Sequence, residues 1–191
     1  MPGTASARSL RRRSAIYRDV LDAPAHKVAE IIAGELHLQP RPASLHALAC
    51  FRLGGLLDGP FSFGRGGPGG WWIVFEPELH LGGDILVPDL AGWRRTTMPD
   101  YPDAPFFTIA PDWVCEVLSP STRSLDLGGK REIYAREGVK RLWFVEPLGR
   151  TLQAFELQAE GWVALGAVHG ADTVSLPPFD DIDFPLDALW P

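Results

Sequence analysis

Two acidic residues of this 191-residue chain lie where an unpaired carboxylate would be costly. Glu116 interrupts the apolar segment 113–118, and Asp89 closes another apolar run, residues 85–88. Carboxylates in water-poor strands need a partner, and a divalent cation commonly binds two acids that are brought together. Taken singly, Glu116 would more often pair with an arginine, and Asp89 would more often cap a turn. Together they favour a metal site.

A lysine near Glu116 would complete a common nuclease arrangement. Many metal-dependent nucleases carry this lysine two residues after the acid, on the same face of the strand, but here that residue is Leu118. Lys130 is the candidate replacement, because it lies in the helix predicted after the strand. A helix packed on the sheet would direct its ammonium back toward Glu116. The alternative is a lysine that faces solvent.

The elements that must position these residues are mainly strands. Leu36 and Leu38 alternate with polar residues and indicate a strand within residues 28–39, which Pro40 ends. The glycine-rich residues 64–70 lack the ending of a phosphate-binding loop and are predicted to form a loop. Apolar runs after them predict further strands at residues 71–75, 78–81, 84–87, 113–118 and 141–145, and a hairpin of residues 151–157 and 161–165.

Two helices are predicted between these strands. Ser44 is a candidate N-cap for a helix that carries Leu45, Leu48, Phe51 and Leu56. A second helix, residues 125–137, ends before Gly138, which suits a position just past a helix end. The order strand, helix, strand over residues 113–145 predicts a parallel crossover. The predicted fold is therefore α/β or α+β, with a mixed central sheet flanked by helices.

The composition is that of an ordinary globular protein with one domain, residues 15–191. The net charge of −6 argues against non-specific coating of nucleic acid but is compatible with a local basic groove. The only two cysteines, Cys50 and Cys115, have apolar neighbours and are predicted to be buried thiols.

The first residues, 1–14, are predicted to form a flexible basic tail that contains Arg8, Arg11, Arg12 and Arg13. No apolar run approaches the about 20 residues that span a bilayer, and the N-terminus lacks a signal-peptide core. We therefore expect a cytoplasmic protein that does not enter a membrane.

The sequence as a whole resembles the Uma-two family of restriction endonucleases, within the PD-(D/E)xK nuclease superfamily. The resemblance covers about residues 15–190, and its most specific part lies between Asp112 and Pro147. The residues that carry it are 30–36, His46, 87–89, 111–112, 116–122, Asp126, Lys130, Tyr134, 138–139, Trp143 and Pro147.

This resemblance implies a restriction-endonuclease-like core, a divalent metal and hydrolysis of DNA phosphodiester bonds. By position, Asp89 and Glu116 match the two motif acids. Some relatives carry lysine where this chain has Leu118, so the lysine role falls to Lys130 or to no residue. Asp89, Glu116 and the Val117 carbonyl would hold Mg²⁺ or Mn²⁺, which prefer oxygen ligands. Glu30 or Glu35 would add a metal or water contact. His46 would orient a ligand or phosphate, or is a structural histidine. By analogy with enzymes that cut both strands, a homodimer is possible.

The sequence is also compatible with two other functions. Leu118 and the acidic net charge would suit a catalytically inactive nuclease fold that binds nucleic acid or a protein partner. Paired carboxylates also serve glycosidases, in which two acids face each other across a sugar. The separation of the acids distinguishes the second alternative from a metal site.

Overall fold

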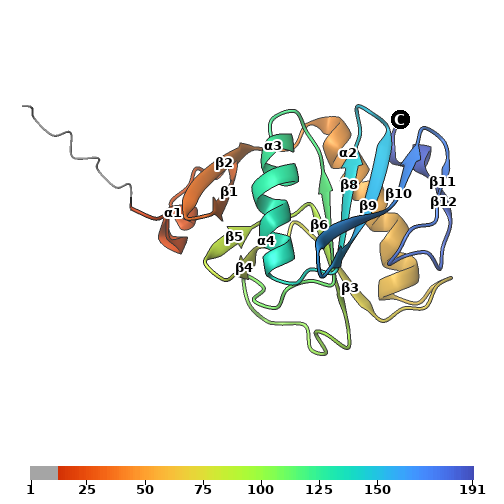
Figure 1. The fold of residues 1–191 in the computed structure, drawn as a ribbon, viewed down its shortest axis with the longest axis horizontal. Helices are drawn as coiled ribbons and strands as arrows, with labels where there is room; N and C mark the ends of the chain where they lie inside the picture. Colours follow the sequence, from red (N-terminus) through yellow and green to blue (C-terminus); the bar gives the residue numbers. More distant parts are fainter. Residues whose placement is uncertain (1–12) are drawn as a thin grey trace, which may run out of the picture.

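The computed structural model describes residues 13–191, and its centre is a mixed six-stranded sheet (Figure 1). The strands of this sheet are β3 (Trp71–Phe75), β6 (Leu90–Arg94), β7 (Trp113–Val117), β8 (Arg141–Glu146), β9 (Thr151–Gln158) and β10 (Gly161–His169). They lie in the order β10-β9-β8-β7-β6-β3. Only the pair β7 and β8 is parallel, which confirms the predicted crossover. The α+β class with a mixed sheet is likewise confirmed.

A smaller sheet lies beside the first and has the order β2-β1-β5-β4. It consists of β1 (Lys27–Ile32), β2 (Glu35–Pro40), β4 (Leu79–Leu81) and β5 (Asp84–Leu86). The one strand predicted within residues 28–39 is thus a hairpin. Ala33 and Gly34 turn the chain with φ values of 52° and 78°, as in a tight two-residue hairpin turn whose central residues both have positive φ.

Helices pack on both faces of the large sheet. One face carries α2 (Ser44–Leu57), which runs on into a wide helical turn, Asp58–Ser62. The crossover helix lies on the other face and consists of α3 (Arg123–Leu125), a π-helical turn (Asp126–Lys130) and α4 (Arg131–Arg136). The remaining short elements are α1 (Tyr17–Leu21), β11 (Thr173–Val174), β12 (Phe184–Pro185) and a 3₁₀ turn (Leu186–Leu189).

The alternation of side chains along β7 separates two hydrophobic cores. Cys115 and Val117 pack in the core formed with α2 and the C-terminal segment, whereas Val114 packs in the core that includes Tyr134 of α4. Glu116 has the opposite parity to Val117, so its side chain projects toward the crossover helix. Both cysteines are buried and free, as predicted.

The structure corrects one detail of the predicted elements and adds an important strand. Ser44 is the first residue of α2 and not its N-cap, which is Ala43. The strand β6 was not predicted, although it lies between β3 and β7 and begins directly after Asp89. Of the predicted basic tail, residues 1–12 lie outside the described residues, and Arg13 pairs with Asp19 at 2.5 Å.

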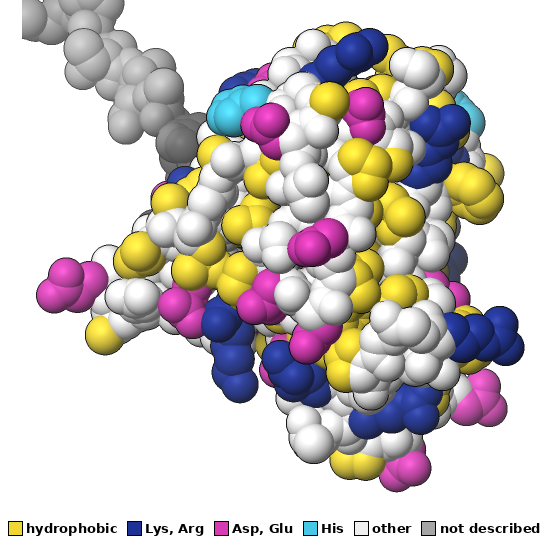
Figure 2. Space-filling model, turned by 90° about the vertical axis from the view of Figure 1, so that its right-hand side faces the viewer, with side chains coloured by type: hydrophobic (Ala, Val, Ile, Leu, Met, Phe, Trp, Pro, Cys, Tyr) yellow, Lys and Arg dark blue, Asp and Glu magenta, His cyan; other side chains and the backbone are white. Residues whose placement is uncertain are grey.

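The surface of the described residues is mixed in character. On the face seen in Figure 2, basic, acidic and hydrophobic side chains are interspersed, and no single charge type covers it. None of the helices between residues 13 and 191 has the length and apolar composition needed to cross a membrane.

Gly138 confirms the predicted end of the crossover helix and supports a stability prediction. Its φ of 79° is left-handed, and a Cβ there would meet no atom within 4 Å. Gly138→Ala should therefore destabilise the protein by about 1–2 kcal/mol through backbone strain alone. Gly55, inside α2 and equally uncrowded, is the matched control. Gly55→Ala should stabilise the protein by about 0.5–1 kcal/mol. Urea unfolding of both variants measures the free energy of unfolding, which should fall in Gly138→Ala and rise in Gly55→Ala.

Candidate active site

A cleft of about 270 Å³ opens at the carboxyl end of β7, between the two sheets and the crossover helix. Main-chain segments from β1, the residues before α2, and the loop after β7 form its walls. Its ionisable lining residues are Glu30, Arg41, His46, Glu76, Asp89, Glu116, Asp126 and Lys130. Of the predicted site residues, Glu30, His46, Asp89, Glu116 and Lys130 thus all line this cleft. Val117 adjoins it through Glu116, and Glu35 does not line it.

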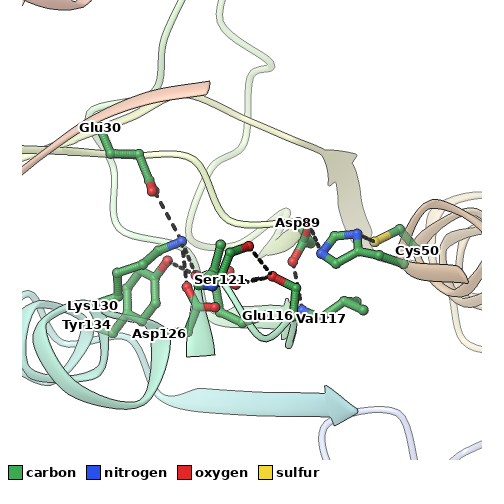
Figure 3. Close-up of polar contacts among 12 residues, drawn as sticks. Glu30, Cys50, Asp89, Glu116, Val117, Ser121, Asp126, Lys130 and Tyr134 are labelled. Carbon is green, nitrogen blue, oxygen red and sulfur yellow. Dashed lines mark hydrogen bonds and ion pairs between the residues drawn. The ribbon is translucent and has the colours of Figure 1, made fainter. Parts of the chain in front are cut away.

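Lys130 forms the centre of a buried ionic cluster on one side of the cleft (Figure 3). Its Nζ lies 2.9 Å from Glu116 Oε1, 3.1 Å from Glu30 Oε1 and 3.3 Å from Asp126 Oδ1. The four side chains are each no more than 4% exposed. The lysine of the crossover helix therefore faces Glu116, as predicted, and does not face solvent.

The local sequence explains how Lys130 reaches this position. Asp126 and Lys130 begin and end the π-helical turn, so both side chains lie on its inner face. A Cβ on Gly129, within this turn, would lie 3.1 Å from Ile32 of β1. The missing side chain therefore lets the turn approach the strand that carries Glu30.

Glu30 and Glu116 are each held by a second hydrogen bond. Glu30 Oε1 accepts from the backbone N–H of Val87 at 2.8 Å, which ties β1 to the segment after β5. The hydroxyl of Tyr134 donates to Glu116 Oε1 at 2.5 Å. These bonds fix both carboxylates before any ligand enters the cleft, because each satisfies part of the hydrogen-bonding capacity of a buried acid.

Asp89 lies on the bend before β6, beside the end of β7. Its Oδ2 accepts from the backbone N–H of Val117 at 2.7 Å. Leu90 pairs with Cys115, so Asp89 and Glu116 occupy adjoining positions on neighbouring segments. The Asp89 side chain is 14% exposed and lines the cleft.

A second polar group extends from Asp89 into α2. His46 Nε2 lies 3.2 Å from Asp89 Oδ1, and His46 Nδ1 lies 3.4 Å from Cys50 Sγ. Burial opposes the charged form of His46, but Asp89 and the backbone of Val117 outweigh it and raise the pKa of the imidazole. Burial also raises the pKa of the Cys50 thiol, which therefore keeps its proton.

The electrostatics of the cluster reflect an excess of negative groups. Burial raises the pKa of Glu116 well above its usual range. Lys130 lowers this pKa, whereas the nearby carboxylates of Asp126, Asp89 and Glu30 raise it further. Burial opposes the charge on Lys130, but the surrounding carboxylates outweigh it and raise the pKa of this lysine well above its usual value. The ammonium is therefore charged at neutral pH, and further positive charge would be stabilised in the cleft.

The predicted set of site residues omitted some that the structure places at the site, and it included one that lies outside it. Glu35, at the start of β2, is exposed and does not line the cleft, because the hairpin turn carries it away from Glu30. Asp126, Tyr134 and Cys50 were given no role. The spacing of Asp126, Lys130 and Tyr134 at intervals of four was the signal that places three polar groups on one helix face.

The fold is similar to that of a solved structure from Anabaena variabilis, described as "a putative nuclease belonging to DUF820". The two chains are 20% identical, the match covers 88% of this chain and 93% of the other, and the TM-score is 0.73. At this identity the likeness shows a shared fold.

The family comparison goes further. Residues 17–187 match the model of the Uma2 family, which is described as "Putative restriction endonuclease". The chain belongs to this family, and the resemblance drawn from its motifs is confirmed. No curated protein matches it significantly.

The buried ionic cluster predicts the cost of removing its cation. Lys130→Met should destabilise the protein by about 3–5 kcal/mol at pH 8, because three buried carboxylates lose their partner. These acids would then bind protons more tightly in the folded state than in the unfolded state, so the loss should shrink as the pH is lowered toward 5. Lys140→Met is the matched control, since Lys140 is exposed and lies 3.7 Å from Asp112. Urea unfolding at pH 8 and pH 5 measures the free energy of unfolding of both variants. Equal losses in Lys130→Met and Lys140→Met at both pH values would contradict this account.

Proposed function

We propose that this protein is a metal-dependent endonuclease that hydrolyses phosphodiester bonds in DNA. The observation that carries the proposal is the Lys130 ammonium at 2.9 Å from Glu116, buried in a cleft that Asp89 also lines. An acid, a second acid from the neighbouring strand segment and a fixed ammonium are the groups that phosphodiester hydrolysis uses. Membership of a family described as restriction endonucleases supports it.

The residues of the cleft fit a hard divalent cation. Five carboxylates line it beside one buried ammonium, so oxygen donors are in excess over cationic groups. They belong to Glu30, Glu76, Asp89, Glu116 and Asp126. We assign Asp89, Glu116 and the Val117 carbonyl as the ligands. Oxygen donors suit Mg²⁺ and Mn²⁺ equally well.

Each residue then has a defined task. A bound cation would polarise the phosphate and acidify an attacking water. Lys130 supplies fixed positive charge where negative charge develops on the phosphate. Tyr134 and the Val117 N–H hold Glu116 and Asp89 in place. Arg41, exposed at the cleft rim, is suited to a phosphate of the DNA backbone.

The two alternatives are less well supported. A glycosidase needs acids on opposite sides of a sugar, whereas the Asp89 carboxylate is bonded to the residue that follows Glu116. The inactive-fold alternative was based on Leu118 and on the acidic net charge, and the structure bears on the first of these. This side chain is 6% exposed and packs in the core, so the ammonium near Glu116 is supplied by the helix and not by the strand.

Cleavage of supercoiled plasmid with Mg²⁺ or Mn²⁺ tests the activity directly. Glu116→Gln keeps the size of the side chain but removes its charge, so it should lower the rate by about 10²–10³-fold. Glu132→Gln, on the exposed side of α4, should cleave at the wild-type rate. A wild-type protein that binds DNA but does not cleave it with either metal would favour the inactive binding module.

The metal assignment is tested separately by thermal unfolding. At an ion concentration about tenfold above Kd, binding to the native state alone adds about 1.4 kcal/mol, or about 3–6 °C for a chain of this size. Mg²⁺ or Mn²⁺ should raise the Tm of wild type and of Asp180→Asn, whose side chain is exposed. Asp89→Asn should lose the shift. Equal shifts in all three proteins would place the ion elsewhere.

A further inference from the structure

His46, Cys50 and Asp89 bring together three kinds of metal-binding atom at the edge of the cleft. The helix places His46 and Cys50 one turn apart on the same face of α2, and Asp89 approaches from the bend before β6. One ligand atom from each residue lies within 4.8 Å of the other two. Among the described residues, no other set of three histidine, cysteine or acidic side chains meets this condition.

The separations suit a small tetrahedral ion. Zinc-like ions bind nitrogen and oxygen at about 2.0–2.2 Å and thiolate sulfur at about 2.3 Å, so tetrahedral ligand atoms lie about 3.3–3.6 Å apart. The observed contacts are 3.2 Å between His46 Nε2 and Asp89 Oδ1, and 3.4 Å between His46 Nδ1 and Cys50 Sγ. One ring nitrogen must serve the ion. The two contacts end on different ring nitrogens, but one ligand atom from each residue already lies within 4.8 Å of the other two, so side-chain rotations would bring the three donors to one ion.

The donor set differs in chemistry from the carboxylate cluster around Lys130. A thiolate and an imidazole are ligands for Zn²⁺ and similar transition metals, whereas Mg²⁺ takes oxygen donors. His46 and Cys50 are 9% and 1% exposed, so their metal bonds would be shielded from water. Asp89 and His46 line the cleft, which gives the ion a route of entry and leaves a fourth position for water.

We propose that His46, Cys50 and Asp89 form a second metal site, specific for a thiophilic divalent ion such as Zn²⁺. On binding, the Cys50 S–H bond breaks, a sulfur–metal bond forms and the proton leaves to solvent. The site shares Asp89 with the assigned Mg²⁺ site. Insofar as the nuclease function above holds, the thiophilic ion withdraws an oxygen of Asp89 from that site and inhibits cleavage.

Co²⁺, a spectroscopic substitute for Zn²⁺, tests binding without reference to activity. Titration of the metal-free full chain should give one equivalent of tetrahedral Co²⁺ with a thiolate-to-cobalt charge-transfer band, which Zn²⁺ abolishes. Cys115→Ala should keep the band, and Cys50→Ala should lose it while retaining its Mg²⁺-induced rise in Tm. Both cysteines are buried, so the two variants are matched.

The outcome does not depend on the folding of Cys50→Ala. The chain has two cysteines, so a band in Cys115→Ala can arise only from Cys50. No band in the wild type, or a band that Cys115→Ala removes, would overturn the site. In plasmid cleavage, Zn²⁺ should inhibit the wild type at a concentration at least about tenfold below that needed for Cys50→Ala, the change produced by about 1.4 kcal/mol of lost binding. A wild type without nuclease activity would refute the proposed function, while the Co²⁺ titration would still decide the metal site.

Discussion

The buried ammonium of Lys130 is the interaction on which the arrangement of the cleft depends. It joins β1, β7 and the crossover helix through Glu30, Glu116 and Asp126. A buried charge is tolerated only when its partners are close and well oriented, so a displacement of any of these elements would leave a charge uncompensated. Among the described residues, the strands of the small sheet pair with one another and not with those of the large sheet, and this cluster supplies a polar connection between the two sheets. The same contacts that fix the architecture also fix the acids that line the cleft.

The end of β7 serves two groups of residues at once. Glu116 belongs to the Lys130 cluster on one face of the strand, and the neighbouring residue, Val117, donates its N–H to Asp89. Asp89 in turn contacts His46 of α2. The ammonium of Lys130 and the imidazole of His46 thereby lie against Glu116 and Asp89, respectively.

Much of this arrangement was predictable from local patterns. The apolar runs predicted β3 and all of β7, and the crossover helix predicted between parallel strands placed Lys130 near Glu116. Local patterns do not predict the elements and contacts that tertiary packing determines.

The strand β6 contains Gly92 and follows Pro88, so it shows neither alternation nor a long apolar run. The hairpin turn at Ala33 and Gly34 removes Glu35 from the cleft. The approach of Cys50 to Asp89 joins residues 39 positions apart that share no local pattern.

The position of the lysine shows how one chemical requirement can be met from another element. On the strand, position 118 has the parity to face Glu116, but Leu118 packs in the core instead and contributes to its stability. The ammonium comes from the helix, whose inner face is brought close to β1 by Gly129. A lysine on the strand would be placed by the sheet alone, whereas Lys130 is placed by the docking of the helix. The geometry around Glu116 is therefore coupled to the packing between β1 and the crossover helix, and any contact that shifts this helix also shifts the ammonium that faces Glu116.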